Sequence, residues 1–127
     1  MFSEDVEVLS TYVEESTERL DELEDSLRVL DAHRERTDPE LVNAMFRTAH
    51  SLKAGANLLE LRTIERLAHR MENILEQYRR RQRTPDDTTL KLLFETVDAI
   101  QTLLLDVEQS NNADLSSLLR RLATCLY

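Results

Sequence analysis

Apolar residues recur every three to four positions along most of the chain, in long stretches separated by short polar breaks. Spacing of this kind predicts amphipathic α-helices rather than strands. The first helix is predicted from about Ser3 to Leu30, because Ser3 can cap it and acidic residues follow at the positive end of its dipole. Its predicted apolar stripe consists of Val6, Leu9, Val13, Leu20, Leu23, Leu27 and Leu30.

Two further helices are predicted in the middle of the chain. The second begins near Asp38-Pro39, where a capping residue precedes a proline in the first turn, and ends at about Asn57. Thr37 and Glu40 also fit a capping box at this start. Residues 58–61 form a tight connection, and the third helix follows over residues 63–82. Its predicted inward positions are Ile64, Leu67, Ala68, Met71, Ile74, Leu75 and Tyr78.

The run Thr84-Pro85-Asp86-Asp87 signals a fourth helix that continues to about Gln109. Residues 110–112 are predicted as a turn, and residues 114–126 as a short fifth helix. Four long amphipathic helices with short connections predict an all-α fold, an antiparallel four-helix bundle with an additional short C-terminal helix. Residues 1–127 are expected to form a single domain. The predicted core of the fourth helix is Leu90, Leu93, Phe94, Val97, Ile100, Leu104 and Val107.

Charge and composition narrow the classes of function. Sixteen basic and twenty-five acidic residues give a net charge of −9, which argues against binding of nucleic acid. No apolar run approaches the roughly 20 residues that span a bilayer, and the N-terminus lacks the core of a signal peptide. We therefore expect a cytoplasmic domain without membrane insertion. The single cysteine, Cys125, excludes an internal disulfide and is expected to pack between helices.

Two charged runs have simple explanations. The acidic face of the first helix is predicted to be solvated. The arginines at positions 79, 80, 81 and 83 crowd the end of the third helix, where cations suit the helix dipole. A docking patch for an acidic partner is the alternative interpretation of these arginines. His33 lies in a polar loop and is expected to be exposed.

His50 is the residue that fits the apolar pattern least. At 100° per residue it falls about 140° from the core direction of its helix, which points it towards solvent. On the third helix, Glu65, His69, Glu72 and Glu76 form a polar stripe, with Glu72 at the boundary of the core. If these helices are antiparallel neighbours, a carboxylate there can accept a hydrogen bond from one imidazole nitrogen. That bond fixes the tautomer and leaves the other nitrogen with an outward lone pair.

The segment Phe46–Ala56, with the sequence FRTAHSLKAGA, resembles the phosphoacceptor motif of histidine phosphotransfer (HPt) domains. It is most similar to the N-terminal phosphotransfer domain of CheA-type chemotaxis histidine kinases. Residues 69–75 and 92–98 are similar to the third and fourth helices of that family. The resemblance therefore covers nearly the whole chain and implies a five-helix domain, expected to be the N-terminal part of a larger histidine kinase.

The resemblance also implies roles for individual residues. His50 corresponds to the phosphoacceptor and Glu72 to the carboxylate that orients it. Lys53 and His69 correspond to polar neighbours of the phosphoryl site, and Lys53 could balance the charge of an attached phosphoryl group. The implied partners are an ATP-binding kinase domain, usually in the same dimeric protein, and a CheY-like receiver domain whose aspartate takes the phosphoryl group onward.

Two positions after His50 call for comment. HPt domains usually have glycine directly after the motif lysine, whereas this chain has Ala54. The choice of partner protein is therefore the property in which we expect this chain to differ from the family. Gly55, the only glycine, lies on a different side of the helix, where a close contact between helices would explain it.

A chain with one glycine has no glycine-rich phosphate loop, so the domain is expected to carry phosphate without binding ATP or other cofactors. ATP and magnesium would be used by the partner kinase domain. Three alternatives stay open: a stand-alone HPt protein of a multistep phosphorelay, a helical interaction domain without chemistry, and a metal site. The metal site would use His50, His69 and Glu72 as a two-histidine, one-carboxylate set.

Overall fold

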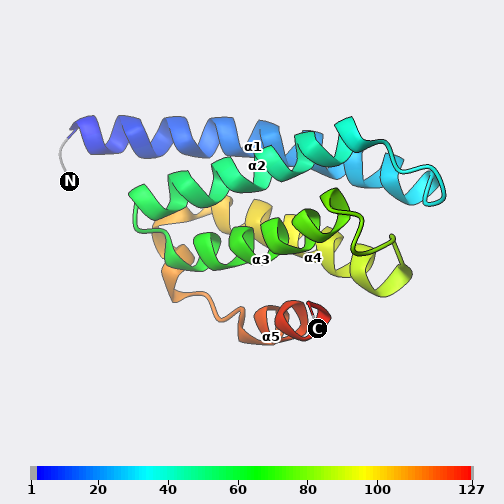
Figure 1. Cartoon of the computed structure of the whole chain (residues 1–127). Helices are drawn as coiled ribbons and strands as arrows, with labels where there is room; N and C mark the ends of the chain where they lie inside the picture. The colour runs from blue at the N-terminus through cyan, green and yellow to red at the C-terminus, as the bar shows by residue number, and fades with distance from the viewer. Residues whose placement is uncertain (1–2, 127) are drawn as a thin grey trace.

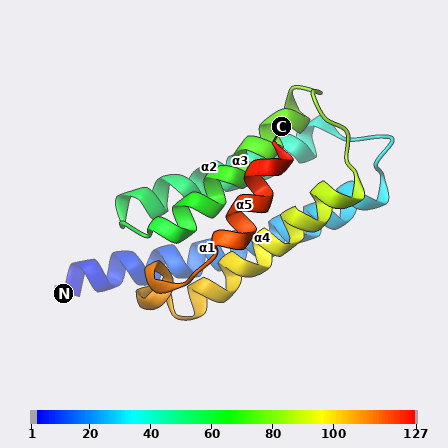
Figure 2. The same ribbon diagram turned by 90° about the horizontal axis from the view of Figure 1, so that it is seen from below.

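A computed structural model of the chain describes residues 3–126, and within that range every regular element is a helix. Four long helices form an antiparallel bundle, and a short fifth helix packs on two of them, which confirms the predicted fold class (Figures 1 and 2). No helix in this range is both long and apolar enough to cross a membrane. The helices are α1 (Ser3–Ala32), α2 (Pro39–Leu58), α3 (Arg62–Arg79), α4 (Asp87–Leu105), the 3-10 helix η1 (Val107–Asn112) and α5 (Ser116–Cys125).

Two predicted helix ends are wrong. Helix α3 ends at Arg79 instead of residue 82, because Arg81 has a left-handed φ of 58°. The amide of Gln82 then bonds the carbonyl of Gln77 at 2.8 Å, which closes the helix end. Helix α4 ends at Leu105 instead of residue 109, and residues 107–112 form η1 instead of continuing the helix into a turn.

The helix starts use aspartate caps. Asp38 accepts a hydrogen bond from the amide of Glu40 at 2.9 Å, and Asp86 accepts one from the amide of Thr89 at 2.8 Å. The capping box expected from Thr37 is therefore wrong, since the Thr37 hydroxyl donates backwards to a carbonyl of the preceding loop. The cap predicted at Ser3 involves a side chain outside the described residues.

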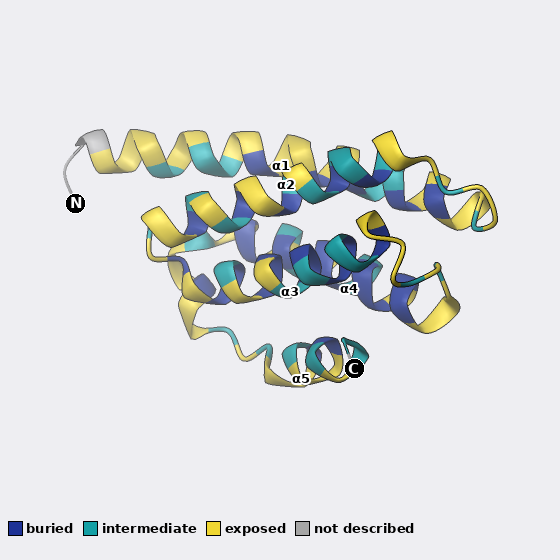
Figure 3. Ribbon diagram, in the orientation of Figure 1, coloured by how far each residue is buried: buried dark blue, intermediate teal, exposed yellow. Residues whose placement is uncertain are grey.

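The core is the region that the four long helices enclose, and the fully buried apolar side chains of α1 come from its second half. Leu20, Leu23, Leu27 and Leu30 are buried, whereas Val6 is exposed and Leu9 is only half-buried. The first turns of α1 extend beyond the end of α2, and they are mostly exposed in Figure 3. The predicted stripe is therefore wrong at Val6, which is exposed, whereas Leu9 and Val13 pack partly buried against the core.

The end of the chain is fastened through Arg83. Its guanidinium donates to the Gln77 amide oxygen at 2.6 Å, to the Thr89 hydroxyl at 2.9 Å and to the carbonyl of Cys125. The thiol of Cys125 also lies 3.3 Å from the Thr89 hydroxyl. Arg83 therefore ties α5 to the start of α4, and Cys125 is partly buried between helices, as predicted.

Gly55 marks the closest approach of α1 to α2. A Cβ atom at this position would lie 2.5 Å from Cε2 and 2.8 Å from Cδ2 of Tyr12, and real Cβ atoms do not come so close to other atoms. The Tyr12 hydroxyl donates to the carbonyl of Leu52 at 2.9 Å, which holds the ring in place. The predicted close contact between helices is confirmed, and it fixes α1 against the helix that carries His50.

We expect Gly55→Ala to destabilise the protein. Alanine in a helix interior is worth about 1 kcal/mol more than glycine, whereas forcing a methyl group into a filled space costs about 1–3 kcal/mol. Because the Tyr12 ring would also have to leave its hydrogen bond, we expect the steric cost to exceed the gain in helix propensity. The free energy of unfolding measured in urea should therefore fall. The same substitution in a Tyr12→Leu background should be neutral or stabilising; an equal loss in both backgrounds would contradict the contact.

Candidate functional site

His50 lies near the middle of α2 and points away from the core. The buried residues Ala49 and Leu52, exposed by 1% or less, fix the rotation of the helix. His50 consequently keeps 60% of its side chain accessible, as the helical periodicity predicts. A pure interaction domain would be favoured by a buried His50 or by one without a carboxylate neighbour, and neither condition applies.

Glu72 of α3 holds one side of the imidazole. Its Oε2 atom lies 2.6 Å from Nδ1 of His50, and the residue is only 8% exposed. With the carboxylate ionised, Nδ1 carries the proton and donates it in this hydrogen bond. The lone pair is then on Nε2, the nitrogen at the other edge of the ring. The expected hydrogen bond between the two helices is therefore present.

Lys53 shares the same carboxylate. Its Nζ atom lies 2.7 Å from Oε1 of Glu72, so both oxygens of Glu72 are engaged and the two α2 side chains are linked through α3. The sequence suggested that this lysine could balance a phosphoryl group on His50. In the structure its partner is Glu72, and its role towards a phosphoryl group stays a prediction.

Glu72 is ionised in this environment. Burial raises the pKa of its carboxyl, but the hydrogen bonds from Lys53 and His50, together with the attraction of these groups, lower the pKa by more. The net result is a pKa below the ordinary value for glutamate. The site therefore keeps a negative charge beside Nδ1 at neutral pH, where it can stabilise positive charge that develops on the ring.

This pKa predicts how stability depends on pH. Because the pKa of Glu72 is lower in the folded than in the unfolded chain, the ionised carboxylate contributes stability above the ordinary pKa of 4.5. That contribution is lost as the pH falls through the folded-state value. We expect the difference in unfolding free energy between wild type and Glu72→Gln to shrink in urea titrations from about pH 7 to about pH 3. A difference that stays constant over this range would contradict the interpretation.

His69 is not brought into this set of contacts. It lies one turn before Glu72 on α3 with an exposed side chain. Among the described residues, no hydrogen bond joins it to His50, Lys53 or Glu72. In the same range, no three histidine, cysteine or acidic residues are placed to hold a metal ion together, which counts against the two-histidine, one-carboxylate alternative. The assignment of His69 as a polar neighbour stays a prediction.

An aromatic and cationic contact beside His50 was missed from the sequence. The ring of Phe46, one turn before His50, stacks on the imidazole with a centroid distance of 6.2 Å and an interplanar angle of 17°. The guanidinium carbon of Arg79 lies 4.6 Å from the centroid of the same ring. The four-residue spacing of Phe46 and His50 could have indicated the stacking. The contact with Arg79 depends on how α3 packs against α2.

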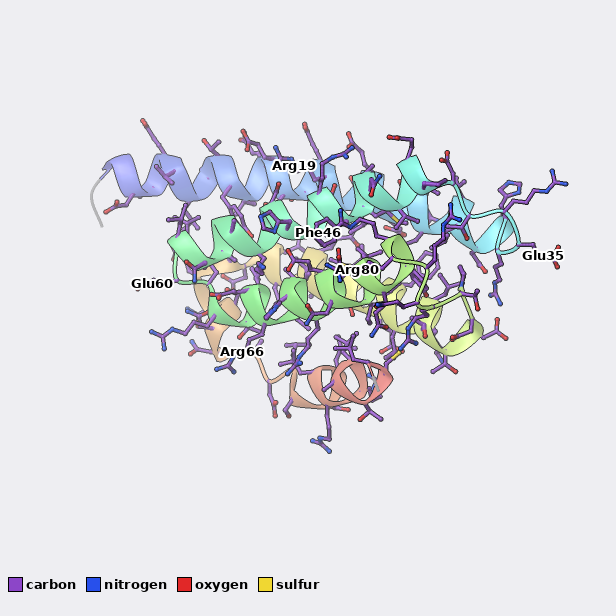
Figure 4. The ribbon with its side chains drawn as sticks, in the orientation of Figure 1. Arg19, Glu35, Phe46, Glu60, Arg66 and Arg80 are labelled. Atoms are coloured by element: carbon purple, nitrogen blue, oxygen red, sulfur yellow. The ribbon has the colours of Figure 1, made fainter. Side chains whose placement is uncertain are left out.

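Glu76 holds the guanidinium of Arg79 in place through hydrogen bonds. Its two oxygens accept hydrogen bonds from Nε and Nη2 of Arg79 at 2.8 and 2.9 Å, and from Nε of Arg80 at 2.6 Å. Figure 4 labels Phe46 on α2 and Arg80 at the end of α3. Ala54, one turn after His50, is exposed and adds one methyl group to the surface next to the imidazole.

The sequence profile of the Hpt domain family matches residues 7–124. The chain is 35% identical over 107 residues to the chemotaxis protein CheA of Salmonella typhimurium, which covers 84% of this chain and 16% of that protein. It is 26% identical over 122 residues to CheA of Listeria monocytogenes, covering 94% of this chain and 19% of that protein. The chain therefore spans less than a fifth of the length of these relatives.

Two solved structures are similar. The CheA phosphotransferase domain from Thermotoga maritima has a TM-score of 0.73 at 33% identity, with coverage of 80% of this chain and 94% of that domain. The phosphorylated P1 domain of CheA3 in complex with CheY6 from R. sphaeroides has a TM-score of 0.79, with coverage of 94% and 95%. At 24% identity, the second likeness concerns the fold alone.

Proposed function

The chain belongs to the Hpt domain family, and on that premise we propose that His50 is a phosphoryl carrier in two-component signalling of the chemotaxis type. One observation carries the proposal. Glu72 holds Nδ1 of an imidazole that is 60% exposed, so Nε2 is free to attack an incoming phosphoryl group.

The first step takes the γ-phosphoryl group of ATP. The Nε2 lone pair forms a bond to the γ-phosphorus while the bond from phosphorus to the bridging oxygen breaks, and ADP leaves with that electron pair. Positive charge develops on the ring, and the Glu72 carboxylate on Nδ1–H stabilises it. We assign ATP and magnesium to a separate kinase domain, and the domain described here would need no cofactor of its own.

The second step returns His50 to its free state. A carboxylate oxygen of an aspartate on a CheY-like receiver domain attacks the phosphorus, and the bond from phosphorus to Nε2 breaks. The electron pair of that bond becomes the Nε2 lone pair again, and Nδ1 keeps its proton and its hydrogen bond to Glu72 throughout. A phosphorylated relative of this fold has been captured with CheY6, which supports a receiver of that class as the acceptor.

The donor is proposed to be an ATP-binding histidine kinase domain in the same, dimeric protein, because the CheA relatives are several times longer than this chain. Both partners would then act in the cytoplasm, where ATP is available.

A labelling experiment tests the proposal. The chain is incubated with the ATP-binding module of its cognate kinase and ATP labelled at the γ-phosphate, and the receivers of the same organism are then added one by one. We expect a label that is stable in alkali, labile in acid and located on His50 by mass spectrometry, followed by rapid transfer to at least one receiver. An acid-stable label, or one on a hydroxyl group, would overturn the proposal.

A further inference from the structure

Charge is strongly segregated between the helices. Residues 3–32, which form α1, contain eleven acidic and two basic residues, a net charge of −9. Residues 39–83, which form α2, α3 and the turn after them, contain nine basic and five acidic residues, a net charge of +4. The helices that carry His50 and Glu72 are thus cationic in a protein that is acidic overall.

Part of the excess positive charge lies on Arg79 and Arg80 at the end of α3, and both arginines pair with Glu76. This one carboxylate is shared by Arg79 and Arg80, which leaves one positive charge uncompensated, and their side chains are 43% and 65% exposed. By contrast, Glu72 and Lys53 compensate each other. Arg83 is engaged in fastening α5 and does not take part.

Arg79 is also held in place. The ring of Phe46 lies under its guanidinium, and Glu76 binds it through two hydrogen bonds, so little side-chain entropy remains to be lost when it meets a partner. Phe46 also stacks on His50, so one aromatic ring contacts both the cation and the imidazole.

We infer that Arg79 and Arg80 form an electrostatic docking site for an acidic face of the receiver domain that takes the phosphoryl group from His50. This inference rests on the proposed function. The acceptor must bring an aspartate carboxylate up to a dianionic phosphoryl group, and this approach is repulsive unless cations lie nearby. The acidic helix α1 repels the same face, so the charges of this chain orient the receiver onto α2 and α3.

The test measures transfer from purified phospho-His50 protein to the receiver that accepts fastest from wild type. We expect the double variant Arg79→Glu/Arg80→Glu to lower kcat/KM for the receiver about ten-fold or more at low ionic strength. The loss should shrink as salt screens the charges, and kcat at saturating receiver should change little.

The matched control is Arg120→Glu/Arg121→Glu, an adjacent pair on α5, which has its main contacts with α3 and α4. It changes the net charge by the same amount. Equal losses in both double variants, or no loss in the Arg79/Arg80 variant, would overturn the inference. So would a defect confined to phosphorylation by the kinase module.

Two further measurements keep the outcomes separable. The double variant Arg79→Gln/Arg80→Gln removes both charges without placing new carboxylates beside Glu76. Thermal unfolding shows whether each variant is folded. A folded glutamine variant with the wild-type kcat/KM would also overturn the inference. If wild-type protein takes no label on His50, or passes it to no receiver, it is the proposed function that fails.

Discussion

Replacing His50 by glutamine is expected to abolish phosphorylation of the chain by the kinase module. Glutamine is similar in size and polarity, but its amide has no nucleophilic nitrogen lone pair at neutral pH, so no bond to phosphorus can form. The side chain is exposed and the glutamine amide can donate a hydrogen bond to Glu72 in place of Nδ1–H, so the change in stability should be about 1 kcal/mol or less. We therefore expect loss of the label with little change in thermal unfolding.

The matched control for this substitution is His33→Gln. His33 is exposed at the end of α1, far along the chain from the site, and its replacement should leave the rate and extent of labelling at wild-type values. Residual acid-labile label in the His50 variant would show that another residue accepts the phosphoryl group.

Glu72→Ala is expected to slow phosphorylation of His50 by about a hundred-fold, because a reacting group that loses its fixed geometry costs about that much in rate. Without the carboxylate, the imidazole loses the 2.6 Å hydrogen bond on Nδ1, and either nitrogen can carry the proton. Lys53 loses its partner as well, but its side chain is 27% exposed and can turn to water. The rate should therefore fall more than the thermal stability does.

Glu72→Gln separates orientation from charge. The amide oxygen can still accept a hydrogen bond from Nδ1–H, whereas the negative charge that stabilises the developing imidazolium is gone. We expect a rate between those of wild type and the alanine variant in single-turnover labelling. An alanine variant that is labelled at the wild-type rate would remove Glu72 from the site.

The sequence determined the helices, the faces they bury and the outward direction of His50. These follow from a local cause: with 3.6 residues per turn, the positions of Ala49 and Leu52 on the core side fix where every other residue of α2 points. Gly55 could be assigned to a close contact for the same reason. The helix ends were less predictable, because a left-handed φ at Arg81 depends on which carbonyls remain free to accept hydrogen bonds.

The tertiary structure decided which side chains meet across helices. Helical spacing offered Glu65, His69, Glu72 and Glu76 as neighbours of the flank that carries His50, and only the packing of α3 on α2 gives Glu72 to His50. Glu76 instead pairs with Arg79 and Arg80, three and four residues further along the chain, which is a local contact. The packing of α3 on α2 also gave Lys53 a partner and placed Arg79 on Phe46. Periodicity fixes the rotation of each helix, whereas such contacts also require the relative axial position of two helices. That position is set by how their buried side chains interlock.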